Sequence, residues 1–182
     1  MDVPRARFGG GGIQVYGGVG GMGLDTDAAQ GASGKFRRLP GAARYIAGAL
    51  WALGKFQPFQ LQLELDGQPV SVRGPVMLAA VANTPTYGAG VRIAPAAEID
   101  DGLLDVVVVS ELSWLPILEM IPQLLRTGDA RRPELQRFRA RRVALRTDRP
   151  APFHGDGEIL GATPVEIENL PRAVRVVAPA RH

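Results

Sequence analysis

The clearest pattern in the sequence is an alternation of apolar and polar residues with a period of two. It runs through residues 59–65, where leucine alternates with glutamine and glutamate, and through residues 165–168, where valine and isoleucine alternate with glutamate. Such alternation is typical of strands with one face buried and the other in water. The first stretch is followed by Asp66-Gly67 and by apolar positions within residues 70–72, which predicts a β-hairpin.

Other stretches are apolar without alternation. Residues 76–82 and 106–109 are continuous apolar runs bounded by turn-forming residues, and they predict strands buried on both faces. Mixed stretches at residues 13–16, 135–145 and 173–178 predict further strands. We therefore expect a chain made mostly of short β-strands.

Two stretches have the apolar spacing of a helix. One begins at Pro40 and extends to about residue 55, and the other follows Ser113, a good N-cap, and stops at Gly128. A few helices among many strands predict an α+β fold that is mainly β. We expect a two-layered β-sandwich with two or so short helices.

The N-terminal part is rich in glycine. Residues 1–12 end in four consecutive glycines and are expected to be a flexible lead-in, which leaves residues 13–182 as one domain. The glycine-dense stretch at residues 17–25 is not followed by the Lys-Ser or Lys-Thr pair of a P-loop. We therefore expect this stretch to be a close-packed turn.

Composition narrows the classes of function. The chain of 182 residues is 46% hydrophobic and 21% charged, as in an ordinary soluble globular protein. It has no cysteine and two histidines, which excludes disulfides and thiol nucleophiles and argues against a multi-histidine metal site. No apolar run approaches the length of a membrane span, and the N-terminus lacks a secretory hydrophobic core, so a cytoplasmic protein is expected.

The net charge of +3 is unevenly distributed, because the segment from Arg126 to Arg149 has nine arginines and three acids. Guanidinium groups suit phosphates, including those of lipid headgroups. The alternative is that Arg137, Arg139 and Arg141 form only the solvent-facing side of one strand. Nucleic acid is not expected as a partner, because interleaved aromatic residues and known reading motifs are absent.

The stretch with the most candidate chemistry is His-Gly-Asp-Gly-Glu at residues 154–158. Asp156-Gly157 is a strong two-residue hairpin turn, so the carboxylates of Asp156 and Glu158 should lie at or beside a tight turn. Carboxylates fixed in this way can accept a proton or hold a divalent cation, as phosphoryl transfer requires. The alternative is an ordinary turn followed by a solvated glutamate.

A second acidic turn lies at residues 98–105, where several acids surround Gly102. Carboxylates together with exposed main-chain carbonyls at such a turn can bind one hard cation such as Mg²⁺. A metal-free acidic turn explains the same composition.

Several short motifs together resemble the diacylglycerol kinase-like lipid kinases, which include bacterial lipid kinases and have sphingosine and ceramide kinases as relatives. Residues 13–179, nearly the whole chain, resemble the C-terminal β-sandwich domain of that family. The motifs that carry the resemblance are, in order, Asn83, Tyr87–Gly90, Ile93–Pro95, Asp101–Asp105, Asp156–Glu158 and Leu170–Val174. Members normally also have an N-terminal α/β domain with a nucleotide-binding Gly-Gly-Asp-Gly-Thr motif. That motif is absent from this sequence.

The resemblance implies roles for individual residues. Glu158 matches the active-site acid of the family, with Asp156 beside it, and both would face the cleft between the two domains. Asp101 matches a magnesium ligand, with the main-chain oxygens at Glu98 and Leu103 completing the Mg²⁺ site. ATP would be bound mainly by the missing N-terminal domain.

The resemblance also implies partners and leaves two function classes open. In the first, the chain is the substrate-side domain of an ATP-dependent lipid kinase that phosphorylates a diacylglycerol-like or sphingoid hydroxyl, and it is inactive without the nucleotide-binding domain. In the second, it is a non-catalytic lipid-binding or regulatory module. In either class the lipid would be met at a membrane surface, with a peripheral location at the inner membrane. Association of two copies as a homodimer is left open.

Overall fold

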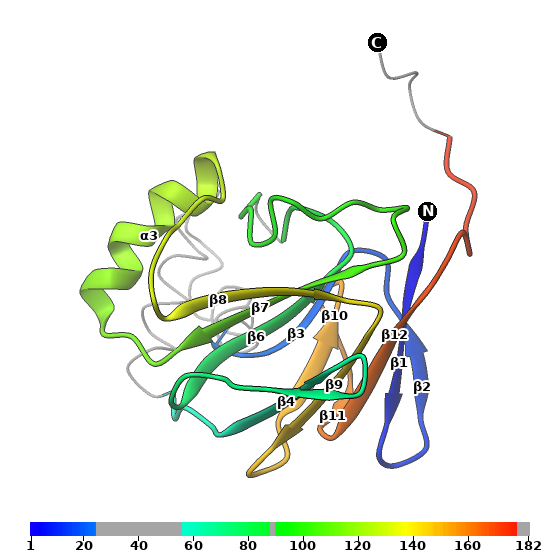
Figure 1. The fold of residues 1–182 in the computed structure, drawn as a ribbon, viewed down its shortest axis with the longest axis horizontal. Coiled ribbons are helices and arrows are strands. Elements are labelled where there is room, and N and C mark those ends of the chain that lie inside the picture. Colours follow the sequence, from blue (N-terminus) through cyan, green and yellow to red (C-terminus); the bar gives the residue numbers. More distant parts are fainter. Residues whose placement is uncertain (25–55, 88–89, 178–182) are drawn as a thin grey trace, which may run out of the picture.

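The structure is a computed structural model that describes residues 1–24, 56–87 and 90–177. These residues form two six-stranded antiparallel sheets packed face to face, with a helix beside the outer face of one sheet (Figure 1). The predicted β-sandwich is therefore confirmed. The helix predicted from Pro40 to about residue 55 lies outside the described residues.

Sheet A has the strand order β2-β1-β12-β9-β4-β5. Its strands are β1 (Val3–Phe8), β2 (Ile13–Val15), β4 (Leu61–Leu65), β5 (Gln68–Val70), β9 (Arg142–Thr147) and β12 (Val165–Leu170). Leu63, Val143 and Ile167 are buried on the face toward sheet B, and none of the described elements covers the other face of sheet A. This one-sided burial explains the period-two alternation in the sequence.

Sheet B has the strand order β11-β10-β3-β6-β7-β8. Its strands are β3 (Val19–Gly23), β6 (Val76–Ala82), β7 (Leu104–Ser110), β8 (Leu135–Ala140), β10 (Pro152–Gly155) and β11 (Glu158–Ala162). In β7, Val106 and Val108 face sheet A, whereas Val107 and Val109 face the layer that contains helix α3 (Trp114–Arg126). Burial on both faces explains the continuous apolar runs.

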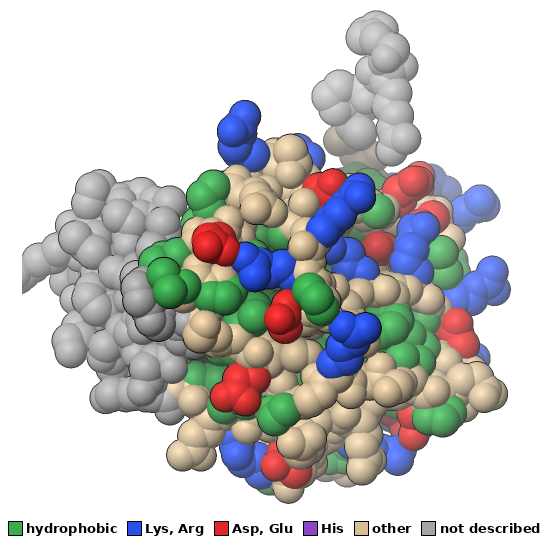
Figure 2. All heavy atoms as spheres, turned by 60° about the vertical axis from the view of Figure 1, so that its left-hand side comes forward, with side chains coloured by type: hydrophobic (Ala, Val, Ile, Leu, Met, Phe, Trp, Pro, Cys, Tyr) green, Lys and Arg blue, Asp and Glu red, His purple; other side chains and the backbone are tan. Residues whose placement is uncertain are grey.

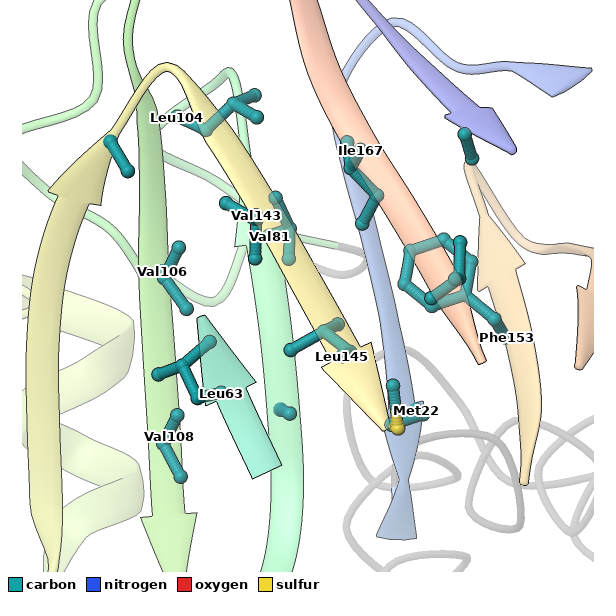
Figure 3. Close-up of a cluster of buried hydrophobic side chains, with 14 of the residues drawn as sticks. Met22, Leu63, Val81, Leu104, Val106, Val108, Val143, Leu145, Phe153 and Ile167 are labelled. Carbon is teal, nitrogen blue, oxygen red and sulfur yellow. The ribbon is translucent and has the colours of Figure 1, made fainter. Parts of the chain in front are cut away.

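The core between the sheets is aliphatic at one end and aromatic at the other (Figure 3). Phe153 is fully buried and lies against the rings of Phe8 and Tyr16, with ring centroids 6.0 and 6.1 Å away. A Cβ at Gly20 would lie 2.7 Å from the ring of Phe153, so the strand can pass this ring only with glycine there. The glycines of β3 therefore belong to the core packing.

The N-terminal prediction was wrong. Residues 3–8 are not part of a flexible lead-in but form β1, which pairs with β12 on one side and with β2 on the other. Asp2 and Ala6 are fully buried. The glycine-dense stretch predicted to be a turn contains β3, which pairs with β6 and β10.

Two further strand predictions were wrong, whereas the helix after Ser113 is confirmed as α3. Residues 135–145 form two strands in different sheets, with a break at Arg141. Asp66 Oδ1 accepts hydrogen bonds from the N–H groups of Arg141 and Arg142 at 3.0 and 2.9 Å, and so caps the crossing. Residues 173–177 are exposed and form no strand.

Candidate active site

The Asp156-Gly157 turn joins β10 to β11, and both turn residues have positive φ, 51° and 92°. Asn and Asp tolerate this backbone region better than most residues, and glycine adopts it freely. Asp156 Oδ2 accepts a hydrogen bond from Gly17 N at 2.6 Å, and Oδ1 accepts from Gly18 N at 2.9 Å. Asp156 therefore fastens the hairpin to the glycine segment before β3.

Glu158 is the first residue of the edge strand β11 and is exposed. Within the described ranges its carboxylate makes no hydrogen bond or ion pair, in contrast to the carboxylate of Asp156. Its backbone is fixed by pairing with Gly155 across the hairpin. The arrangement presents one uncommitted carboxylate on a well-defined turn, which can accept a proton or orient a hydroxyl group.

A chain of hydrogen bonds links this hairpin to the acidic turn around Gly102. Gly102 N donates to Asp2 Oδ2 at 2.7 Å, and Asn83 Nδ2 donates to the carbonyl oxygens of Asp2 at 3.0 Å and Gly17 at 3.2 Å. Gly17 N in turn donates to Asp156. The two predicted sites are therefore connected through fully buried Asp2 and Asn83.

Three aromatic residues near the hairpin were not identified as site residues from the sequence. Tyr16 is buried and donates its hydroxyl to Val81 O at 3.1 Å, and burial together with the charge of Asp156 raises its pKa well above 10.0. His154 is buried on β10, and its ring stacks on Tyr87, whose hydroxyl lies 3.3 Å from Nε2. Side chains alternate between the two faces of a strand, so His154 points away from the core face that holds Phe153. This alternation could have identified His154 as a candidate site residue from the sequence.

The predicted metal residues lie at one turn but are already engaged. Asp101 accepts a hydrogen bond from Leu103 N at 2.9 Å and is ion-paired with Arg139, whose Nε also lies 3.3 Å from Asp105. The carbonyl oxygen of Leu103 accepts from Asn169 Nδ2 at 3.0 Å. Burial raises the pKa of Asp105, and the guanidinium of Arg139 counteracts that shift.

In the arrangement shown, Asp101 and Leu103 are held by partners within the domain. A cation at Asp101 would have to displace Arg139, whereas the carbonyl oxygen of Leu103 has a second lone pair beside its hydrogen bond from Asn169 Nδ2, and Glu98 is exposed at the edge of the turn. No group of three or more histidine or acidic side chains among the described residues has the geometry of a metal site. The magnesium site at Asp101 stays a prediction, with Arg139 as the competitor for its carboxylate.

The arginines of β8 are less available than expected for a solvent-facing strand. Arg137 donates to the carbonyl oxygens of Gly128 at 2.8 Å and Ala130 at 3.0 Å, and burial lowers its pKa. Arg139 is committed to Asp101 and Asp105. These guanidinium groups therefore stabilise loops.

A hollow of about 790 Å³ lies on the outer face of sheet A. It is lined by four arginines and four acids, and Arg5 is ion-paired there with Glu168, whose pKa is lowered by that hydrogen bond. Balanced charge gives the hollow no preference for a phosphate group. None of the predicted site residues lines it.

Within the described ranges no helix is long and apolar enough to span a bilayer.

Known proteins similar to this chain share both its sequence and its fold. The sequence is 29% identical over 182 residues to a "Diacylglycerol kinase" of Mycobacterium tuberculosis (strain CDC 1551 / Oshkosh), which covers 100% of this chain and 58% of that relative. It is 30% identical over 159 residues to a "Probable lipid kinase YegS-like" of Stenotrophomonas maltophilia (strain K279a), covering 86% and 48%. The crystal structure of a diacylglycerol kinase from Bacillus anthracis str. Sterne has a similar fold, with a TM-score of 0.60, 18% identity and coverage of 94% and 51%.

The chain thus spans about half the length of the relatives that it matches. A family match covers residues 18–178 and is described as the YegS C-terminal NAD kinase beta sandwich-like domain. The match includes strands β3 to β12, helix α3 and both acidic turns. The resemblance to the C-terminal domain of the lipid kinases is confirmed, and the chain belongs to the YegS C-terminal domain family.

Proposed function

We propose that this chain is the substrate-side part of an ATP-dependent kinase that phosphorylates the hydroxyl group of a diacylglycerol-like or sphingoid lipid. The observation that carries the proposal is the uncommitted carboxylate of Glu158, held on a turn that Asp156 fastens to Gly17 and Gly18. A module that only binds lipid has no need for an exposed acid on a rigid turn. The names of the matched relatives support the same reaction class.

In this reaction the lipid hydroxyl oxygen attacks the terminal phosphorus of ATP. A new oxygen–phosphorus bond forms, the bond to the leaving ADP oxygen breaks, and the hydroxyl proton passes to the carboxylate of Glu158 or through it to water. Mg²⁺ neutralises the charge of the phosphates when it is bound with ATP. Asp156 acts as a positioning residue, because both its oxygens already accept backbone hydrogen bonds.

ATP is bound mainly by a part of the protein outside this chain. Phosphoryl transfer needs a cradle for the nucleotide phosphates, and the glycine-dense segment here is largely strand β3, without the lysine of a P-loop. We therefore expect no kinase activity from the chain alone, since neither positioning nor charge stabilisation of the transferred phosphoryl group is available.

The experiment compares the chain alone with the chain joined to, or mixed with, a nucleotide-binding part. Each sample receives ATP, Mg²⁺ and vesicles that contain diacylglycerol or sphingosine, and phosphorylated lipid is measured. The proposal expects product only when the nucleotide-binding part is present, and loss of product with Glu158→Ala. If the chain alone turns over lipid faster than its Glu158→Ala variant does, the expectation that activity requires the nucleotide-binding part is contradicted. Full activity of Glu158→Ala in the joined protein contradicts the role of the acid.

A further inference from the structure

Helix α3 (Trp114–Arg126) has more apolar surface than the sandwich covers. One side of it packs on the outer face of sheet B through buried Met120 and half-buried Ile117 and Leu124. This contact buries one apolar stripe of the helix, as is usual for an amphipathic helix on the surface of a globular protein. The helix has a second apolar stripe that this contact does not use.

The second stripe consists of Leu115, Leu118, Pro122 and Leu125. Their spacing of three, four and three residues places them in one line along the helix. Leu115 is 54% exposed and Leu125 is 38% exposed, Pro122 is exposed, and Leu118 is half-buried. Four apolar side chains in one exposed line are a patch rather than isolated surface residues, and such patches mark sites of protein or membrane contact.

The polar surface of α3 is narrow by comparison. It consists of Glu119, Gln123 and Arg126, and Glu119 is ion-paired with Arg132 from the segment after the helix. No acid lies in the first turn, whereas Arg126 lies in the last. Among the residues of α3 itself, the stripe is therefore bordered by a single acid, Glu119, whose charge is balanced by Arg132.

Arginines gather at the C-terminal end of the stripe. Arg126 is exposed in the last turn, and Arg92 is exposed and donates its backbone N–H to Leu124 O at 2.8 Å. The side chain of Arg131 is 86% exposed and is ion-paired with Asp129 at 3.2 Å. Figure 2 turns the side of α3 toward the reader and shows hydrophobic, arginine and acidic side chains intermingled on this face. Leucines bordered by arginines are typical of helices that lie in a membrane interface.

The loop that contains Arg131 is held in place and does not depend on a membrane for its shape. Arg137, whose pKa is lowered by burial, donates two hydrogen bonds to the carbonyl oxygens of Gly128 and Ala130. Arg131 is thus presented from a fixed loop beside the end of the helix. A preformed surface of this kind loses less conformational entropy on binding.

We propose that the stripe of Leu115, Leu118, Pro122 and Leu125, with Arg92, Arg126 and Arg131, docks this domain on a bilayer that contains anionic lipids. The leucines insert between the headgroups, and the arginines lie at the level of the lipid phosphates. Charge complementarity selects a membrane over an apolar protein partner, because Arg92 and Arg126 form no ion pair with a described residue, whereas the charges of Arg131 and Arg132 are balanced by Asp129 and Glu119. The reason for docking rests on the proposed function, since a kinase must reach its lipid substrate in a membrane. Binding to vesicles can be measured without catalysis.

The test measures co-sedimentation of the purified chain with vesicles of phosphatidylcholine alone and of phosphatidylcholine mixed with phosphatidylserine. Leu115→Ser/Leu125→Ser should weaken binding to the mixed vesicles by about tenfold or more, because apolar insertion is lost. Ile13→Ser/Val15→Ser is the matched control, since these β2 residues are 53% and 55% exposed. It should bind as the wild type does. Thermal unfolding of each variant verifies that the fold is retained.

The charges are tested in the same assay. Arg126→Ser/Arg131→Ser should weaken binding to the mixed vesicles by about tenfold and reduce its dependence on salt. The exposed pair Arg7→Ser/Arg175→Ser is the control. Equal binding of the wild type and the leucine variant to mixed vesicles overturns the proposal, as does an equal loss in the β2 variant. The proposal is also overturned if the wild type does not bind vesicles and the leucine variant differs from it in self-association. That result would assign the stripe to an interface between copies of the chain.

A separate assay distinguishes this proposal from the proposed function. In the protein with its nucleotide-binding part, the leucine variant should lose activity on vesicles by about tenfold but keep full activity on a short-chain lipid in detergent. Glu158→Gln should lose activity on both substrates. Equal activity of the leucine variant on both substrates overturns membrane docking, whereas full activity of Glu158→Gln overturns only the catalytic role.

Discussion

The two acidic turns of this domain are alike in sequence and different in structure. Each has acids around a glycine with positive φ, 92° at Gly157 and 76° at Gly102. At the hairpin, backbone N–H groups of Gly17 and Gly18 hold Asp156. At the other turn, the side chain of Arg139 holds Asp101 and Asp105.

The kind of anchor decides what chemistry is left at each turn. Backbone N–H groups satisfy one carboxylate without bringing a positive charge, and Glu158 two residues later forms no ion pair with any residue that the structure describes. A guanidinium can bind two carboxylates at once, and its single positive charge offsets part of their negative charge. The hairpin therefore presents an exposed acid that no described residue pairs with, whereas Asp101 and Asp105 are ion-paired with Arg139.

The largest expected effect is on catalysis. Glu158→Gln in the protein with its nucleotide-binding part should lower kcat by about 100-fold or more, because positioning and proton acceptance by a fixed carboxylate are worth at least this much. The free energy of unfolding should change little, since Glu158 is exposed and unpaired within the described ranges. Steady-state kinetics and urea unfolding measure the two quantities.

Glu166→Gln is the matched control, because Glu166 is an exposed acid on a strand of the same domain, in sheet A. It should keep wild-type kcat. A kcat for Glu158→Gln above about one tenth of the wild type, a loss below about 1.4 kcal/mol, would reduce Glu158 to a turn residue. The non-catalytic module would then explain the domain better.

The second effect is on stability at the hairpin. Asp156→Ala should lower the free energy of unfolding by about 2 kcal/mol, because it removes an acceptor of several backbone hydrogen bonds and puts alanine at φ 51°. Asp156→Asn should cost less, since one acceptor oxygen and tolerance of positive φ remain. A negligible loss from Asp156→Ala in urea unfolding would show that the hydrogen bonds are unimportant.

Much of the fold was predictable because its signals are local. Alternation and continuous apolar runs predicted β4, β6, β7 and β12, and the Asp-Gly turns predicted two hairpins. The difference between alternating and continuous strands even reflects which sheet each belongs to. The candidate acids Asp156 and Glu158 were found for the same reason, since a two-residue turn fixes their positions.

The wrong predictions depend on partners far away in the sequence. β1 is stabilised by β12, where Val3 pairs with Leu170, whereas residues 173–177 have strand-like composition but pair with no strand. The break at Arg141 is set by Asp66. Arg139 looked like a solvent-facing residue, because nothing near it in sequence indicates that Asp101 lies beside it.

The third effect is on stability at the other turn. Arg139→Met leaves Asp105, which is nearly buried, without its cation, and should lower the free energy of unfolding by about 1 to 2 kcal/mol at pH 7. The magnitude is reduced because the side chain of Arg139 is 42% exposed. Burial already raises the pKa of Asp105, and loss of Arg139 raises that pKa further.

The sign of the pH dependence follows from that shift. A carboxyl whose pKa is higher in the folded state than in the unfolded state binds more protons when folded, so it destabilises the fold increasingly as pH rises through the folded pKa. The loss from Arg139→Met should therefore shrink as pH is lowered toward the ordinary carboxyl range. Arg146→Met, which removes an exposed pair with Glu64 at 3.7 Å, should cost less and show little change with pH. A loss from Arg139→Met that is the same at pH 4 and pH 7 would contradict this account.

The smallest effect concerns magnesium at Asp101. Arg139 and a cation compete for the same carboxylate, so a bound ion has to displace a guanidinium already in place. An ion that binds only the folded state raises the free energy of unfolding by about 0.4 kcal/mol when its free concentration equals its dissociation constant. We expect millimolar Mg²⁺ to raise the Tm most in Arg139→Met, less in the wild type and not in Asp101→Asn.

This order is what distinguishes a site at the acidic turn from a general effect of ionic strength. Magnesium that only screens charge would shift the Tm of all three proteins by the same amount, and an equal concentration of charge from NaCl would reproduce the shift. A larger response in Arg139→Met, together with the lack of a response in Asp101→Asn, requires a cation site that includes Asp101, because Arg139→Met frees the carboxylates of both Asp101 and Asp105. Equal shifts in all three proteins would remove magnesium from this turn. Asp101 would then serve only to fasten β8 to the turn through Arg139.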